Sequence, residues 1–259
     1  MFESIVYIVV SFIATVIGAL TGIGGGIVLK TFANIFSNDD VIVVGFYTTI
    51  IVFTMCIVSI LKQKSKGFKF DTKVLIGMSV GSIVGGYLGD YVLNLFVLKF
   101  DETYVKFIQS IILLITLAFL IIYTRIGPKI NKVENPSLLA TSLLGLFLGS
   151  ISIFLGIGGG PLNVSLMVII FGYGMKEAAI YSLSTVFFSQ ISKIISILIA
   201  GNFEKYNLKL VPFLIIVAII GGYVGTSLNQ KMSTKNIELL YVVLMIGLLL
   251  LTLTSIINF

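Results

Sequence analysis

The chain has 259 residues, of which 58% are hydrophobic and only 11% are charged, and its mean hydropathy is +1.13. Because soluble domains carry about 25% charged residues, this composition excludes a soluble enzyme or a nucleic-acid-binding protein. The net charge of +6 comes mainly from lysines in short segments between apolar stretches. We interpret this charge as a signal of membrane topology and not of nucleic-acid binding.

Eight apolar stretches predict the helices. Each crossing of a hydrocarbon core roughly 30 Å thick takes about 20 apolar residues, so the length allows about six to eight crossings. The stretches occur in the order long, short, short, short, and then the same again. They cover residues 4–36, 41–61, 74–98, 104–124, 137–172, 178–200, 208–228 and 237–257.

Two short motifs recur in the same order. GIGGG at 22–26 returns at 156–160, and GGYLG at 85–89 is matched by GGYVG at 221–225. Their nearly constant spacing indicates an internal repeat. We therefore predict an all-α polytopic membrane protein with two homologous repeats, each with a glycine-broken first helix followed by three transmembrane helices. The predicted parts are a first transmembrane repeat (1–130), a cytoplasmic linker (131–136) and a second transmembrane repeat (137–259).

The first stretch of each repeat is too long for one helix, since about 33 residues at 1.5 Å per residue would reach about 50 Å. Glycine has a low helix propensity and readily adopts positive φ, so GIGGG is the predicted break. Pro161 directly follows the second GIGGG, and proline favours the first turn of a new helix. We predict in each repeat a helix, a break near mid-membrane depth and a half-helix.

Charge predicts part of the topology. The loop at 62–73 carries five lysines against Asp71 alone, so we expect it in the cytoplasm. The loops of the second repeat carry balanced charges and leave two arrangements open. If the broken stretch counts as one crossing, each repeat has four crossings and the repeats are parallel. If it returns as a hairpin, each repeat has three and the repeats are inverted.

The two glycine breaks indicate an anion site. Unwound backbone is tolerated at membrane depth only inside protein or beside a water-filled cavity, so the breaks must be internal. A half-helix that starts there points free N–H groups and its positive dipole end into the protein, and two of them can face one small anion. The alternative is that the glycines only permit close helix packing, which we favour for GGYLG and GGYVG. The predicted backbone ligands are Gly24, Gly25, Gly26, Gly158, Gly159 and Gly160.

GIGGG in two halves, each followed by a helix that begins with small and hydroxyl residues, resembles the TauE/SafE sulfite exporter family, also called the four-toluene sulfonate uptake permease family. The resemblance covers almost the whole chain. It implies a bacterial or archaeal cytoplasmic-membrane transporter of small sulfur-containing anions such as sulfite, thiosulfate or organosulfonates. Lys30 departs from the pattern, because an apolar residue is expected in the half-helix.

Hydroxyl and amide groups near the breaks can donate to the oxygens of such an anion. The candidates are Thr48 and Thr49 after the first break, and Asn163, Ser182 and Ser184 after the second. The alternative is that these serines and threonines bond back to carbonyls of their own helices.

Ionisable groups inside apolar stretches are functional candidates by default, and the chain has Lys30, Asp90 and Lys193. Lys193, with Gln190 one turn earlier, either faces the substrate or extends to the membrane surface. Asp90 either binds a coupling proton or cation or pairs with Lys30. Lys30 in turn either attracts the anion or balances Asp90.

The leading hypothesis is a secondary transporter working by alternating access, with an anion channel at the same site as the alternative. An enzyme is not expected, because histidine is absent and Asp90 is the one carboxylate well inside an apolar stretch. The expected partners are the sulfur anion, a coupling proton or cation and the lipid bilayer, with no nucleic acid. No cofactor and no metal are expected, and the oligomeric state is left open.

Overall fold

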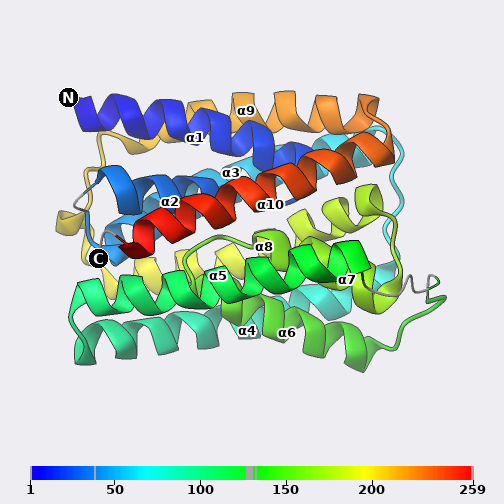
Figure 1. Cartoon of the computed structure of the whole chain (residues 1–259), viewed down its shortest axis with the longest axis horizontal. Coiled ribbons are helices and arrows are strands. Elements are labelled where there is room, and N and C mark those ends of the chain that lie inside the picture. The colour runs from blue at the N-terminus through cyan, green and yellow to red at the C-terminus, as the bar shows by residue number, and fades with distance from the viewer. Residues whose placement is uncertain (1, 38, 127–130, 132, 258–259) are drawn as a thin grey trace.

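A computed structural model describes residues 2–37, 39–126, 131 and 133–257, and in these residues every regular element is helical (Figure 1). Seven helices are long and apolar enough to cross a membrane. Residues 127–130 and 132, at the predicted junction of first repeat and linker, lie outside the described residues. The first five helices are α1 (Phe2–Thr21), α2 (Gly26–Phe36), α3 (Val41–Ser65), α4 (Thr72–Lys99) and α5 (Glu102–Ile126). The others are α6 (Leu138–Phe154), α7 (Pro161–Phe171), α8 (Met175–Ala200), η1 (Phe203–Lys205), α9 (Val211–Lys231) and α10 (Thr234–Ile257).

The order of helix lengths is consistent with the predicted repeat. In each half a first helix ends just before GIGGG, an 11-residue helix follows, and three long helices complete the half. The second short helix begins at Pro161, as expected for a proline in a first turn. The all-α polytopic fold with a glycine-broken first helix is therefore confirmed.

Each broken stretch is a hairpin. The hydroxyl of Tyr7, near the start of α1, lies 2.6 Å from the carboxylate of Asp39, just past the end of α2. In the second half the N–H of Val133, before α6, donates to the carbonyl oxygen of Phe171 at the end of α7 (2.9 Å). The chain thus returns to the side it entered from. α1 is long enough to cross the membrane but forms one arm of the first hairpin, so three full crossings, α3–α5 and α8–α10, remain in each half. The two hairpins therefore enter from opposite ends of the molecule, which is the inverted arrangement.

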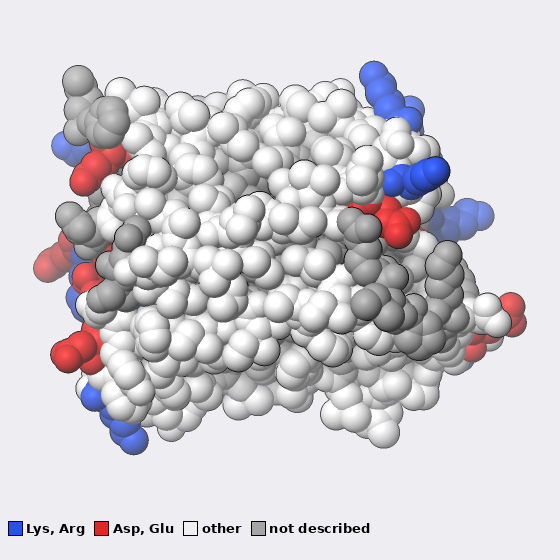
Figure 2. Space-filling view, in the orientation of Figure 1, with Lys and Arg blue, Asp and Glu red and all other residues white. Residues whose placement is uncertain are grey.

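Charged side chains gather at the two ends of the helices and leave an uncharged belt between them (Figure 2). One end, which we call the lysine-rich end, carries Lys62, Lys64, Lys66, Lys69, Lys73, Lys176, Lys231 and Lys235. The opposite, acidic end carries Glu3, Asp39, Asp40, Asp101, Glu102 and Glu204 beside four lysines, Lys99, Lys106, Lys205 and Lys209. The positive-inside rule puts the lysine-rich end, with the loop at 62–73, in the cytoplasm.

The later glycine motif of each half packs against the first helix of the other half. A Cβ atom at Gly85 of α4 would overlap the backbone of Leu146 on α6. A Cβ atom at Gly225 of α9 would likewise overlap the backbone of Val16 on α1. Small residues let membrane helices approach this closely, so GGYLG and GGYVG have the predicted packing role. The two halves are interlocked by these contacts.

We predict that Gly85→Val lowers the free energy of unfolding by about 1–3 kcal/mol, because the added side chain forces α4 away from α6. Gly247→Val in α10 is the matched control, since a Cβ there meets no described atom within 4 Å. Thermal unfolding of the purified variants in detergent measures the difference. Equal melting temperatures for the two variants would contradict the packing role.

Candidate functional site

The two GIGGG segments meet in the interior of the molecule. The N–H of Gly160 donates to the carbonyl oxygen of Ile23 (2.7 Å), and a Cβ at Gly24 would lie 2.5 Å from the carbonyl oxygen of Gly158. Gly25 has φ of 72° and Gly159 has φ of 115°, conformations that side chains disfavour. Each break therefore supplies part of the hydrogen bonding that the unwound backbone of the other needs at membrane depth.

A small cavity lies beside the second break, between α3 and α8. Its lining includes five predicted site residues, Thr48, Thr49, Gly158, Gln190 and Lys193, together with Ser152. The volume is about 10 Å³, which is room for about one water molecule. The structure thus brings together predicted ligands from three separate parts of the chain, namely α3, the second break and α8.

Two polar atoms at this cavity have no hydrogen-bond partner among the described residues. They are the hydroxyl oxygen of Thr48 and the side-chain oxygen of Gln190, on residues that are 2% and 1% exposed. An unpaired buried polar group costs about 1–3 kcal/mol of stability. The orientation of a glutamine amide is assigned from its surroundings, so either its NH₂ or its oxygen can face a ligand. The cavity therefore offers polar groups that are free to bind.

Lys193 also faces this cavity, and its ammonium forms a buried ion pair with Asp90 of α4. Lys193 is 7% exposed and does not extend to the membrane surface, and Asp90 does not pair with Lys30. The repeat counterparts of Lys193 and Asp90 are Ser59 and Thr226, whose hydroxyls are hydrogen-bonded at 2.9 Å. Each pair joins the two halves, α4 to α8 in the charged pair and α3 to α9 in the neutral pair, so the predicted repeat relates a charged contact to a neutral one.

Lys30 lies on the far side of the second break from Lys193. Its ammonium donates to the side-chain oxygen of Gln109 (2.5 Å) and to the carbonyl oxygen of Leu155. Gln109 donates in turn to the carbonyl oxygen of Phe154 (2.6 Å). Lys30 and Gln109 together therefore cap the C-terminal end of α6, where the helix dipole favours positive charge.

The other predicted ligands do not line the cavity. The hydroxyl of Ser182, the repeat counterpart of Thr48, donates to the carbonyl oxygen of Gly22 (2.7 Å). Ser184 bonds back to Ile180 on its own helix, which was the alternative for such residues. Asn163 accepts a long bond from Ser152 (3.5 Å). Five of the glycines, Gly24, Gly25, Gly26, Gly159 and Gly160, are absent from the lining, and a Cβ at Gly26 would meet the backbone of Ile157 and the methyl group of Thr48.

Two polar residues near the breaks were not singled out from the sequence. Ser152 lines the cavity and also approaches the carbonyl oxygen of Gly159 (3.3 Å). The one sequence feature that points to Ser152 is its position four residues before the second GIGGG, where the first repeat has Gly18. Gln109 was an uncharged amide in an apolar stretch, and only its contact with Lys30 makes it notable.

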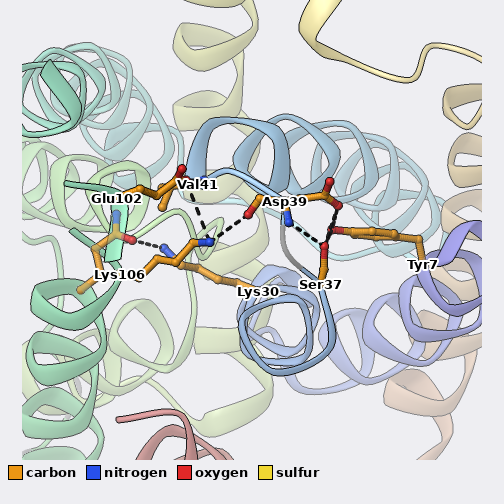
Figure 3. A network of polar contacts seen from close by, with 8 residues as sticks. Tyr7, Lys30, Ser37, Asp39, Val41, Glu102 and Lys106 are labelled. Atoms are coloured by element: carbon orange, nitrogen blue, oxygen red, sulfur yellow. Dashed lines mark hydrogen bonds and ion pairs between the residues drawn. The ribbon is translucent and has the colours of Figure 1, made fainter. Parts of the chain in front are cut away.

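Polar contacts at the acidic end join the first hairpin to α3 and α5 (Figure 3). Lys106 of α5 donates to the carbonyl oxygen of Asp39 (2.9 Å), whose carboxylate accepts from Tyr7. Glu102, one turn before Lys106, accepts from the N–H of Val41 at the start of α3. This network anchors the α1–α2 hairpin above the breaks.

A much larger cavity, of about 990 Å³, lies at the lysine-rich end among α3, α8 and α9. Its basic lining residues are Lys62, Lys66, Lys176 and Lys231, and Glu177 is its one acidic residue. We call this cavity the basic vestibule. Between the vestibule and the breaks the backbone is closely packed, since a Cβ at Gly22 would lie 2.5 Å from the Cβ of Ala179.

Comparison with known proteins agrees with this architecture. The sequence model of the family described as Sulfite exporter TauE/SafE matches residues 7–252. A protein of Bacillus subtilis named probable membrane transporter protein YunE is 28% identical, over 93% of this chain and 94% of its own length. A Methanocaldococcus jannaschii protein named probable membrane transporter protein MJ0441 is 27% identical, over 90% of this chain and 89% of its own.

No solved structure matches the chain. The family match nevertheless extends across both hairpins and all six full crossings. The chain therefore belongs to the TauE/SafE sulfite exporter family of membrane transporters and is a multi-pass protein of the plasma membrane.

Proposed function

We propose that the protein is a secondary transporter that moves a small sulfur-containing anion, such as sulfite, thiosulfate or an organosulfonate, by alternating access. The main support for this proposal is the cavity beside the second break. There, two buried polar side chains have no hydrogen-bond partner among the described residues, and a lysine lies beside them. The moving parts are the two repeats, residues 1–130 and 137–259, joined by the linker at 131–136. The family to which the chain belongs supports the substrate class.

In this proposal the anion accepts hydrogen bonds from the hydroxyls of Thr48 and Thr49 and from the amide of Gln190. The ammonium of Lys193 supplies the charge, and the N-terminal end of α7 adds its positive dipole end. Lys193 is held by Asp90 while no anion is bound, so the anion and the Asp90 carboxylate compete for one ammonium. Binding therefore frees Asp90, which links occupancy of the site to movement of α4 against α8.

Differences between the halves support an alternating cycle. Near the acidic end, a Cβ at Gly45 would meet no described atom within 4 Å, and the Thr48 hydroxyl is free. At the corresponding places near the lysine-rich end, Ala179 packs on Gly22 and the Ser182 hydroxyl is bonded to Gly22. We propose that these roles exchange in the other state, in which Ser182 faces the anion and the basic vestibule connects to the site.

Volume favours a transport cycle over a channel. A cavity with room for about one water molecule cannot hold sulfite until the surrounding helices separate. The vestibule at the lysine-rich end attracts anions from the cytoplasm by its positive potential. The anion then reaches the site only after the contact between Gly22 and Ala179 opens.

Counterflow tests the transporter directly. Proteoliposomes loaded with unlabelled sulfite, thiosulfate or taurine should transiently accumulate the same labelled anion, because an alternating carrier exchanges one bound ion for another. Accumulation should saturate with concentration and should occur for only some of the anions. Flux that follows the gradient without any accumulation would instead support the channel.

Thr48→Val should abolish stabilisation of the protein by the transported anion while raising the stability of the anion-free protein by about 1–3 kcal/mol, because the unpaired hydroxyl is removed. Thr185→Val is the matched control, since that equally buried hydroxyl donates to its own helix at Tyr181 (3.0 Å). Melting curves with and without the anion measure both effects. Retained anion stabilisation in Thr48→Val would rule out its role as a ligand.

Asp90→Asn should destabilise the protein by about 3–5 kcal/mol, because it leaves Lys193 buried without its countercharge. The double variant Asp90→Thr, Lys193→Ser copies the neutral pair of Thr226 and Ser59 and should recover most of that stability. It should nevertheless lose saturable anion transport. Melting temperature and counterflow are measured on both variants, and normal transport by the double variant would contradict the role of Lys193.

A further inference from the structure

Lys30 is a buried ammonium group without a countercharge. It is 5% exposed, and among the described residues no carboxylate forms an ion pair with it. Its partners are neutral, the amide oxygen of Gln109 and the carbonyl oxygen of Leu155. A charge in this position is costly, whereas the neutral amine is not.

A second small cavity adjoins this lysine, between α2, α5 and α10. Its polar lining is formed by Lys30, Thr31, Asn34, Gln109, Ser110, Thr252 and Ser255. The hydroxyl of Ser255 is buried, at 4% exposed, and has no hydrogen-bond partner among the described residues. The volume of about 10 Å³ suits one water molecule. Asn34 and Ser255 lie toward the acidic end, so the polar lining runs from Lys30 toward that side of the membrane.

The groups that face Lys30 disfavour its charge more than they balance it. From α5 comes the repulsion of Lys106, a like charge. From α10 come the hydroxyls of Thr252 and Ser255, and from α2 the amide of Asn34, all neutral. The carbonyl end of α6 and the side-chain oxygen of Gln109 favour the ammonium, and both are neutral. Asp90, the other candidate for a coupling proton, has its charge balanced by Lys193.

The position of Lys30 connects it to the anion cavity. A Cβ at Gly156 would lie 3.1 Å from the ammonium nitrogen of Lys30, and Gly156 also lines the cavity beside Thr48. One short segment of backbone thus has Lys30 on one side and the anion cavity on the other. The repeat counterpart of Lys30 is Val164, so only the first half has this arrangement.

We propose that Lys30 is the proton-binding residue that couples anion transport to the proton gradient, an inference that rests on the proposed function. The neutral amine of Lys30 takes a proton from the solution at the acidic end of the molecule, through the cavity lined by Ser255. The ammonium then holds the carbonyl of Leu155 and with it the second break. The proton stays on Lys30 while the anion-loaded protein rearranges, and the ammonium loses it on the other side of the membrane when the anion leaves.

The test uses proteoliposomes that contain a trapped pH-sensitive dye and the anion that counterflow identifies, preferably thiosulfate or a sulfonate, since neither takes up protons near neutral pH. The wild-type protein should move protons together with the anion. Lys30→Met and Lys30→Arg should retain anion counterflow and lose the proton signal. Arginine keeps the positive cap on α6, so a purely structural role predicts an unchanged proton signal in that variant. Lys99→Met, an exposed charge at the acidic end, is the control and should retain both activities.

The outcomes separate the two proposals. Counterflow without proton movement in the wild type would overturn the role of Lys30 and leave the transporter intact. A proton signal that persists in Lys30→Arg would also overturn it, and this variant decides the question if Lys30→Met does not fold. Absence of counterflow for every anion in the wild type would overturn the proposed function, and the coupling role with it.

Discussion

Unwound backbone inside a membrane must find hydrogen-bond partners within the protein, and the whole arrangement depends on how two such segments satisfy this requirement together. The N–H of Gly160 reaches the carbonyl oxygen of Ile23, and Gly24 lies against the carbonyl of Gly158. Neither break is stable at that depth alone. Their meeting point fixes the two hairpins relative to each other, and it places α3 and α8 beside a shared centre where an anion can be held.

The interlocking of the two halves follows from the glycines of the later motifs. α4 of the first half packs against α6 of the second hairpin, and α9 of the second half packs against α1 of the first hairpin. The hairpin of each half is therefore in close contact with a long helix of the other half. A change at one break is therefore transmitted to both halves. Two corresponding contacts between the halves nevertheless differ in chemistry, with an ion pair between Asp90 and Lys193 at one and a bond between two hydroxyls at the other. The two contacts are therefore not chemically equivalent.

The sequence predicted the helices, the breaks and several site residues, because each of these depends on local properties. Apolar length and glycine content locate the helices and breaks. A hydroxyl near the first break points to Thr48, and helical spacing from Lys193 points to Gln190. The hairpin arrangement was not predictable, since loop charges balance and the deciding contact joins Tyr7 to Asp39, 32 residues away. The partner of Asp90 was not predictable either, because Lys193 lies 103 residues away. Nor does sequence distinguish the free hydroxyl of Thr48 from the bonded hydroxyl of Ser182.

The most direct measurement is a structure of the protein with selenite, whose shape and charge match those of sulfite and whose selenium can be located by anomalous scattering. We expect one selenium peak within hydrogen-bond reach of the Thr48 hydroxyl and the Gln190 amide, with Lys193 drawn away from Asp90. A peak confined to the basic vestibule, or none at saturating selenite, would contradict an anion site at the meeting point of the two breaks.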